Sequence, residues 1–589
     1  MSRASDRPPR AFPEWLWFVA ALLWIAAAPT HPDSWSDASR LATVESLLHR
    51  GTFRIDESPW VAVGDRILLP DGFRSHQPPF FSVLAVPISF CIEALGWQLA
   101  PESVAAHYLG LVALLVALPF ALFVRALDRE LASSRSPHRW VAPALLCASF
   151  ATPYALVLNH HLPAATCAGI GLLALRRGEA AWRVGLWLGV AAALDLPAIG
   201  FALAAFALAP ESGSRLRWTL GCAAGAAPAL AAAGLLQLLS TGELAPGGLR
   251  SDAFAWPNSS FLFEPLTGQL PARSAAATWI YVLRGTVWNY GLFAYHPWLL
   301  LAAGGTLWSA RGRGSTRASA RAALAGGLAV LLLYGLFSEN QGGSCFGVRW
   351  LVLLVPALAL HTDRCPLLFR GRAARLALAL LLLWSAFFAA VGAVAPFSRW
   401  NPFARHGDEA AADREAGRSV LSALVHEALR VRALGPRFDE SYLRREYVFG
   451  LERRARNLER AGDLLAAQKL GERLASAAPE DRSSRGRVAL AEARLRARGG
   501  DPAAALRAAK RGLELRPGEP ALLLLAVELA LLDLDWRAGC ATEIRALARL
   551  VADEVAEPEP GWRERARALL ERGKTSRSGF PRLPSGDDR

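Results

Sequence analysis

The chain has 589 residues, of which 53% are hydrophobic and 20% charged, and its formal net charge is +14. Long stretches without charge fill the first two thirds, which excludes an ordinary soluble domain there, and no nucleic-acid-binding motif accompanies the basic charge, so we expect no nucleic-acid partner. The seven cysteines form no Cys-X-X-Cys pair and lie mostly in apolar segments, which is typical of small buried side chains.

Residues 1–13 contain three arginines and are predicted to be cytoplasmic. The apolar run that follows, from about Trp15 to Pro29, is interpreted as an uncleaved first helix because many apolar stretches come after it. Since a spanning helix needs about 20 apolar residues, residues 14–396 predict an all-α, polytopic transmembrane bundle of about 10–12 spans. The candidate spans are about 14–30, 104–125, 140–158, 162–175, 184–209, 218–240, 288–308, 321–337, 349–362 and 375–396.

Two apolar stretches do not fit a simple crossing. Residues 79–97 follow Pro78 and contain Pro87 and Glu93, which predicts an interfacial or re-entrant helix at the outer face. Residues 184–209 are interrupted at Asp195-Leu196-Pro197, so we expect them to enter and return as two short helices.

Arginine clusters between the apolar segments set the orientation, because basic loops favour the cytoplasmic side. The outer side then receives the first loop (31–77, with an amphipathic helix to about Arg50), the turn at 159–161, and the loops 241–285 and 338–348. The C-terminal tail is also expected outside. Polar groups thus gather on one face, which indicates a site at the outer surface.

Three of these outer stretches carry a resemblance: Asp37 just after the first helix, Asp71-Gly72-Phe73-Arg74-Ser75-His76-Gln77-Pro78-Pro79-Phe80, and Gly342-Gly343-Ser344-Cys345-Phe346-Gly347-Val348-Arg349-Trp350. Together with the stretches 159–163 and 291–297, they make the chain resemble the C-type glycosyltransferase superfamily, closest to bacterial relatives of protein O-mannosyltransferases and lipid A aminoarabinose transferases. Two positions depart from the family pattern: Gln77 replaces the usual Lys, and Val348 replaces the usual Pro.

The resemblance implies a transferase that takes a sugar from a polyprenyl-phosphate donor at the extracytoplasmic face of the inner membrane. It implies Asp37 as the catalytic base or acceptor-orienting carboxylate, although an N-cap role would also explain this residue. Arg349, His161 and Gln77 are the implied contacts of the donor phosphate. Snorkelling to lipid head groups is the alternative for Arg349.

Four further residues are weaker candidates. Asp71 can simply form a turn with Gly72, and Asp195 can cap a half-helix beginning at Pro197. His160 belongs to the same turn as His161, and His296 belongs to an interfacial aromatic belt that could also stack on sugar. The sequence shows no tight cluster of metal ligands, only Asp37, Glu45, Asp65, His76, His160 and His161 scattered over loops. The need for a divalent ion stays open, because some relatives use one and others do not.

The tail has a different composition. Residues 397–449 are interpreted as a helical linker, 450–552 as two to three tetratricopeptide-like repeats, and 553–589 as a terminal helix with a disordered end. Gly462-Asp463 and Ala466-Ala467 recur as Gly500-Asp501 and Ala504-Ala505, and Asp501 and Ala504 recur as Asp535 and Ala538. Such repeats offer a concave face to a protein partner, although a plain helical bundle is the alternative.

Two other functions remain open at this stage. A transporter of a lipid-linked or anionic substrate would account for the interrupted stretch 184–209, but it predicts symmetry between two halves that the sequence does not show. A catalytically inactive scaffold, recruiting partners through the repeats, would account for Gln77 and Val348.

Overall fold

The computed structural model describes residues 13–396 except for 14, 33, 134–139, 209–213, 251, 255, 257–258, 260–272, 288–290, 339–344, 366–370, 395 and some single side chains. Beyond residue 396 it describes parts of 447–462, residues 463–530 apart from 479 and 517–518, residue 546, and residues 562–575. The chain is mostly helical and divides into two compact units, Met1–Asp439 and Glu440–Arg589. Each unit is described by itself.

The first unit begins with the elements that carry the first loop. They are α1 (Trp15–Ala27), α2 (Trp35–Arg50), β1 (Arg66–Leu69), β2 (Gly72–Ser75) and α3 (Pro79–Ala94). The helical bundle follows: α4 (Val104–Val112), a π-helical turn (Ala113–Ala117), α5 (Leu118–Ser133), α6 (Val141–Cys147), α7 (Ala151–Ala155), α8 (His161–Arg177), α9 (Ala181–Leu194), α10 (Ile199–Ala207), α11 (Arg215–Thr241), α12 (Ala275–Thr286), α13 (Leu292–Tyr295), α14 (Trp298–Ser309), α15 (Gly314–Phe337), α16 (Leu354–Ala359) and α17 (Gly371–Val394).

Four helices in the described part of the chain are long and apolar enough to cross a membrane, which indicates a multi-pass membrane protein. They are Val104–Ala132, Arg215–Thr241, Gly314–Phe337 and Leu376–Ala393. Several other expected spans are shorter or broken. The stretch 140–158 is not one helix but α6 and α7, and 349–362 begins as a 3₁₀ helix (Arg349–Leu353) before α16. The stretch 184–209 breaks at Asp195, as expected, into α9 and α10.

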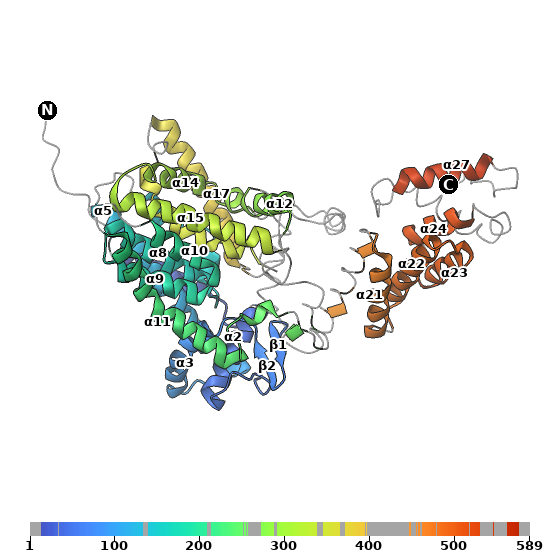
Figure 1. Ribbon diagram of the computed structural model, residues 1–589, viewed down its shortest axis with the longest axis horizontal. Helices are drawn as coiled ribbons and strands as arrows, with labels where there is room; N and C mark the ends of the chain where they lie inside the picture. The colour runs from blue at the N-terminus through green and yellow to red at the C-terminus, as the bar shows by residue number, and fades with distance from the viewer. Residues whose placement is uncertain are drawn as a thin grey trace. The chain divides into compact units, whose positions relative to one another are not determined.

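The bundle packs through small residues where α9 meets α11. A Cβ atom added at Gly185 or Gly189 of α9 would meet the backbone of α11, and one added at Gly225 of α11 would meet the backbone of α9. The two helices therefore pack backbone against backbone at these glycines, and small residues at such crossings are typical of helix pairs in membranes. Helices α8, α9, α10 and α15 lie together in the bundle (Figure 1).

The first loop folds into a small layer at one end of this bundle. Figure 1 shows α2, α3 and the two strands grouped there, with α11 extending toward them. The strands form an antiparallel hairpin with Arg66 opposite Ser75, so the expected all-α fold needs this exception. Gly72 has φ +130° beside the turn, which explains why a glycine stands there.

Helix α2 is the helix expected to end near Arg50, but instead of one polar and one apolar face it has every residue from Ser36 to Ser46 buried. Its N-cap is Ser34, whose hydroxyl accepts the backbone N–H of Asp37. Asp37 therefore stands in the first turn and is not the N-cap that the sequence left open. Its carboxylate instead contacts Ser34, Tyr108 and Arg40 inside the fold.

The second unit contains α21 (Leu464–Ala477), α22 (Arg482–Arg498), α23 (Pro502–Leu515), α24 (Pro520–Ala530) and α27 (Trp562–Thr575). The repeated Gly-Asp pairs start equivalent helices: Asp463 and Asp501 are N-caps that accept the N–H of Ala466 and Ala504. Consecutive helices pack against one another, and Ala505, Ala509 and Leu522 lie in the core between them. The third recurrence, Asp535 and Ala538, lies outside the described residues.

Candidate functional site

The site is built around a carboxylate in the first turn of α2. Asp37 is fully buried, and its two oxygens accept hydrogen bonds from the hydroxyls of Ser34 (2.8 Å) and Tyr108 (2.6 Å). Tyr108 in α4 also accepts the backbone N–H of Leu158 at 3.2 Å. One tyrosine thus joins the first loop to the chain that leads into α8.

Arg40 lies one helical turn after Asp37, and its side chain is also buried. Its Nη1 is 3.7 Å from the Asp37 carboxylate and donates to the Leu158 carbonyl at 3.2 Å, while its Nη2 donates to Oε1 of Gln77 at 2.7 Å. The same Nη2 contacts Nδ1 of His160. Burial lowers the pKa of Arg40 to about 10 against the opposing charge of Asp37, so the guanidinium remains protonated at neutral pH.

Gln77 connects Arg40 to a second carboxylate. Its amide nitrogen donates to Oδ2 of Asp65 at 3.1 Å, and the Ser36 hydroxyl donates to the same oxygen at 2.5 Å. His76 stands 4.0 Å from Asp65. Burial lowers the pKa of His76 against the charge of Asp65, and the positive charges of Arg40 and Arg349 lower it further. We therefore expect a neutral His76 between charged neighbours.

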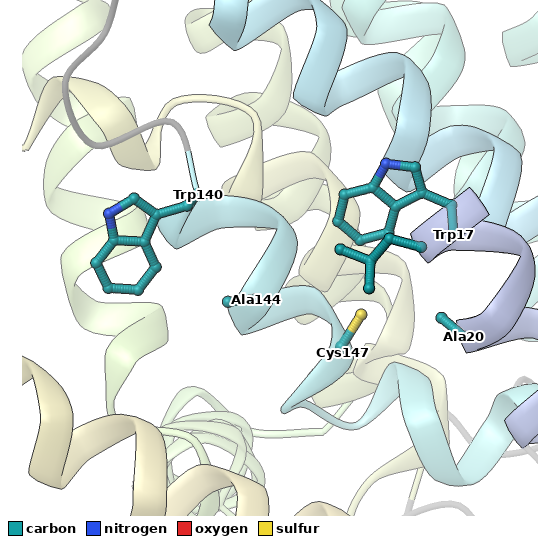
Figure 2. Close-up of a pocket in the computed structure, with 6 residues that line it drawn as sticks. Trp17, Ala20, Trp140, Ala144 and Cys147 are labelled. Atoms are coloured by element: carbon teal, nitrogen blue, oxygen red, sulfur yellow. The ribbon is translucent and has the colours of Figure 1, made fainter. Parts of the chain in front are cut away.

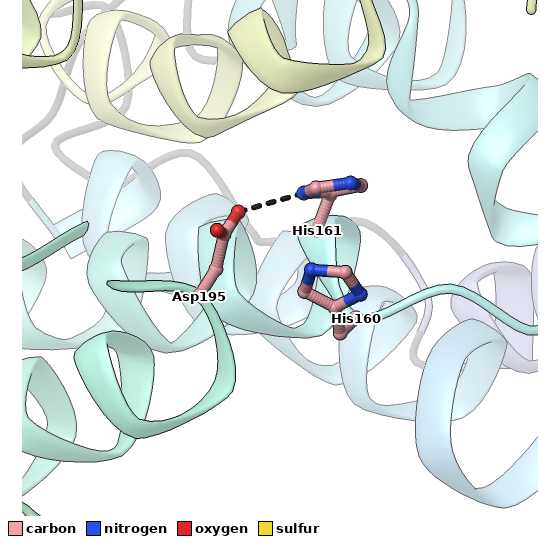
Figure 3. Close-up of side chains that lie close together, drawn as sticks. All are labelled: His160, His161 and Asp195. Atoms are coloured by element: carbon pink, nitrogen blue, oxygen red, sulfur yellow. Dashed lines mark hydrogen bonds and ion pairs between the residues drawn. The ribbon is translucent and has the colours of Figure 1, made fainter. Parts of the chain in front are cut away.

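His160, His161 and Asp195 form the other half of the site (Figure 3). Asn159 orders the turn before α8, since its side-chain oxygen accepts the N–H of Leu162 at 2.9 Å. The two imidazoles lie with ring centroids 4.0 Å apart. His161 Nδ1 is 2.7 Å from Oδ2 of Asp195, which sits in the break between α9 and α10. The carboxylate makes no capping hydrogen bond to the 3₁₀ turn at Leu196–Ala198, so capping does not explain Asp195.

Arg349 follows a turn that several aromatic residues hold in place. Tyr154 donates to the Phe346 carbonyl at 2.7 Å, and Trp350 stacks on Tyr334 with ring centroids 4.6 Å apart. Gly347 has φ +61° and faces the Phe150 ring. The charge of Arg349 acts on both Arg40 and His76, so this guanidinium lies within electrostatic range of α2 and the hairpin. The residues 342–344 of the same motif lie outside the described residues.

Six of the eight predicted residues therefore belong to one region: Asp37, Gln77, His160, His161, Asp195 and Arg349. Asp71 does not, because it sits on the hairpin turn with its side chain 67% exposed and pairs with Arg74. His296 is buried against Phe150 instead, with ring centroids 4.6 Å apart. One aromatic ring thus separates His296 from the Gly347 turn.

Two residues of the site, Arg40 and Tyr108, were not predicted from the sequence. Arg40 could have been found, because it stands three residues after Asp37 in a helix whose neighbours are small: Ser36, Ala38, Ser39 and Ala42. Tyr108 lies in an apolar stretch that resembles any spanning helix, and nothing in its spacing points to Asp37.

Three potential metal ligands lie closer together in the structure than the sequence indicated. The potential ligand atoms of His160, His161 and Asp195 all lie within 4.8 Å of one another, and all three residues are buried. A carboxylate and two imidazoles suit Zn²⁺ or Mn²⁺. However, Arg40 already occupies Nδ1 of His160, and a cation beside a guanidinium is electrostatically unfavourable.

A separate cavity lies between α1 and α6 (Figure 2). It has a volume of about 290 Å³ and is lined by Leu16, Trp17, Ala20, Trp140, Ala144 and Cys147. This lining is almost wholly apolar and includes none of the polar residues described above, so the cavity suits hydrocarbon and not the charged chemistry of the site.

Comparisons of the chain with protein families, with curated proteins and with solved structures find no match.

Proposed function

We propose that the chain is a C-type membrane glycosyltransferase that transfers a sugar from a polyprenyl-phosphate donor to an acceptor at the extracytoplasmic face of the inner membrane. The observation that carries this proposal is the buried Asp37–Arg40 pair with the charge of Arg349 in range. A departing lipid phosphate needs cations, and an attacking acceptor needs a carboxylate or imidazole near it. The site offers both at one end of the bundle.

The contacts of Arg40 concern position 77, where this chain has Gln and the resembled family usually has Lys. A Lys at position 77 would put a second cation against the buried guanidinium, whereas the Gln77 carbonyl oxygen accepts a hydrogen bond from it at 2.7 Å. In this proposal Arg40 supplies the positive charge that the resembled family carries at position 77. Because Arg binds phosphate through several N–H groups, the exchange keeps the binding chemistry.

Apolar surface near this end supports a lipid-linked substrate and contact with membrane lipid. Phe90, Leu95 and Trp97 at the end of α3 are more than half exposed, as are Leu235 and Leu239 on α11, which packs against α3. Exposed apolar surface of this kind is unfavourable in water but favourable against hydrocarbon. The repeats of the second unit are proposed to recruit a protein partner.

The test is turnover of a radiolabelled short-chain polyprenyl phosphate carrying a hexose or aminoarabinose, with the chain reconstituted in nanodiscs. Asp37→Asn should reduce turnover at least about 100-fold, since the negative charge that balances and positions Arg40 is lost. Asp71→Asn is the matched control, because this carboxylate is exposed on the hairpin turn. Equal activity of both variants, or no turnover by the wild-type chain, would overturn the proposal.

A transporter is the second candidate, and the break at Asp195 favours it. An unwound segment with a buried carboxylate and imidazole is a common place for a coupling ion or proton. Uptake of the labelled donor into sealed vesicles, without chemical conversion, would favour the transporter over the transferase.

A further inference from the structure

The hydrogen bonds of the two neighbouring histidines fix opposite proton positions. An ionised carboxylate only accepts, so the 2.7 Å contact with Asp195 puts the proton of His161 on Nδ1 and leaves a lone pair on Nε2. A guanidinium only donates, so the contact with Arg40 makes Nδ1 of His160 the acceptor and puts its proton on Nε2. The pair therefore offers one proton acceptor and one proton donor side by side.

This assignment also decides against a metal held by all three side chains. For His160 to bind a metal through Nε2, it would have to lose that proton while Nδ1 still accepts from Arg40. Oδ2 of Asp195 is already the acceptor of His161. The arrangement matches a carboxylate that orients a histidine through one ring nitrogen and leaves the other, here Nε2 of His161, to react.

The Asp37 carboxylate is less suited to accept a proton. Both of its oxygens already accept hydroxyl hydrogen bonds, at 2.6 and 2.8 Å, and Arg40 lies 3.7 Å away. It is fully buried, and its contacts are those of a residue that positions Arg40 and Tyr108.

We propose that His161, oriented by Asp195, is the general base of the reaction; this rests on the proposed function. Nε2 of His161 takes the proton of the acceptor hydroxyl as the acceptor oxygen bonds to the anomeric carbon. The bond from that carbon to the phosphate oxygen breaks, and its electron pair leaves with the polyprenyl phosphate, whose charge Arg40 and Arg349 balance. The imidazolium, paired with Asp195, then returns the proton to water. Asp37 is a positioning residue.

The first experiment replaces the acceptor by water or by azide, using the full chain in nanodiscs and the same labelled donor. Water must lose a proton to attack, whereas azide attacks as an anion and needs no base. His161→Ala and His161→Gln should lose hydrolysis about 10²–10⁴-fold but still form the glycosyl azide at near the wild-type rate. Retained azide transfer also shows that the variants fold. His49→Gln is the control, since His49 lies outside the site.

Asp195→Asn should give a smaller loss than His161→Ala and should change the pH dependence of hydrolysis, because the amide can still accept from Nδ1–H but no longer stabilises the imidazolium. Unchanged hydrolysis in His161→Ala, or equal loss of both reactions, would overturn the base assignment while leaving the transferase standing. A wild-type chain that converts no donor would overturn the function itself.

A second measurement needs no turnover. Solid-state ¹⁵N NMR of histidine-labelled protein in lipid should find His161 protonated at Nδ1 and His160 at Nε2, with assignment from His161→Gln and His160→Gln spectra. The same tautomer for both rings, or two charged rings, would contradict the inference.

Discussion

At the residue scale, the position of Arg349 depends on a single left-handed glycine. Gly347 has φ +61°, and a Cβ atom there would overlap the Phe150 ring. Gly51 has nearly the same φ, +64°, but open space around its Cβ position. The two glycines therefore share the backbone strain of a substitution and differ only in the steric overlap.

We expect Gly347→Ala to destabilise the chain by about 1–3 kcal/mol more than Gly51→Ala, because the ring must move as well. Donor binding should weaken with it, since the Arg349 turn shifts. Thermal unfolding in detergent and titration with the labelled donor measure the two effects. Equal unfolding temperatures for the two variants would show that the Phe150 ring can move aside at no cost in stability.

His49 connects α2 to the end of α3 and should make this contact sensitive to pH. Its Nε2 is 3.0 Å from Glu93 and its Nδ1 3.3 Å from Glu45. Burial lowers the pKa of His49, but the hydrogen bonds and charges of Glu93 and Glu45 outweigh burial and raise it above 6.5. A raised pKa stabilises the fold fully below the unfolded value and loses this contribution as pH rises through the folded value.

His49→Gln should therefore lower the unfolding temperature most below pH 6.5, and the difference should shrink to nothing as pH rises above the folded pKa. The effect is limited to under about 1 kcal/mol, since a partly exposed pair is screened by water. In a Glu93→Gln background the same substitution should matter much less. A difference that stays constant from about pH 5 to pH 9 contradicts the ionic link.

The sequence was enough to single out most of the polar residues of the candidate site, but not to show which of them contact one another. Asp195 was a weaker candidate, because a carboxylate is costly in an apolar stretch but can also cap a half-helix, and in the structure it contacts the buried His161. Its partner, His161, is 34 residues away, and no local pattern joins the two. Arg40 was visible as an arginine, but its burial depends on packing that no single stretch encodes.

At the element scale, the predictions follow hydrophobic periodicity and fail where turn chemistry decides. The break at Asp195 was predicted because Asp and Pro interrupt an apolar run. The hairpin was missed, because the strands are four residues long and an Arg at each strand hides the alternation. The turn residues Pro70-Asp71-Gly72 were noticed, but they did not specify strands, because the hydrophobic partners of β1, Ala253 and Phe254, are distant in the sequence.

The crossing of α9 and α11 gives an element-scale prediction. A Cβ atom at Gly225 would overlap the carbonyl of Trp182, whereas one at Gly234, on the same helix, would meet only Leu244 at 3.7 Å. Both substitutions gain the same helix propensity, so the difference between them comes from the overlap. Gly225→Ala should therefore destabilise the bundle by about 1–3 kcal/mol, while Gly234→Ala should be neutral or stabilising. Thermal unfolding decides, and a stabilising Gly225→Ala would mean that the helices are not in close contact there.

At the scale of the whole molecule, the proposed function depends on which side of the membrane each polar cluster faces. The positive-inside rule predicts that the first loop lies outside and that Arg176, Arg177 and Arg183, where α8 ends and α9 begins, lie inside. Glu57 in the first loop and Arg183 at the start of α9 each expose more than half of their side chains. These two positions can therefore report on topology without disturbing the core.

We expect Glu57→Cys, in a chain freed of its seven native cysteines, to react with a membrane-impermeant maleimide in intact spheroplasts. Arg183→Cys should react only after the membrane is opened, and Arg511→Cys, exposed on α23, should react like Glu57→Cys because the tail is predicted outside. Labelling in detergent shows that each thiol is reactive. If Glu57→Cys and Arg183→Cys react from the same side, the arginine clusters do not set the orientation, and the site would face a compartment other than the one where the proposed donor is used.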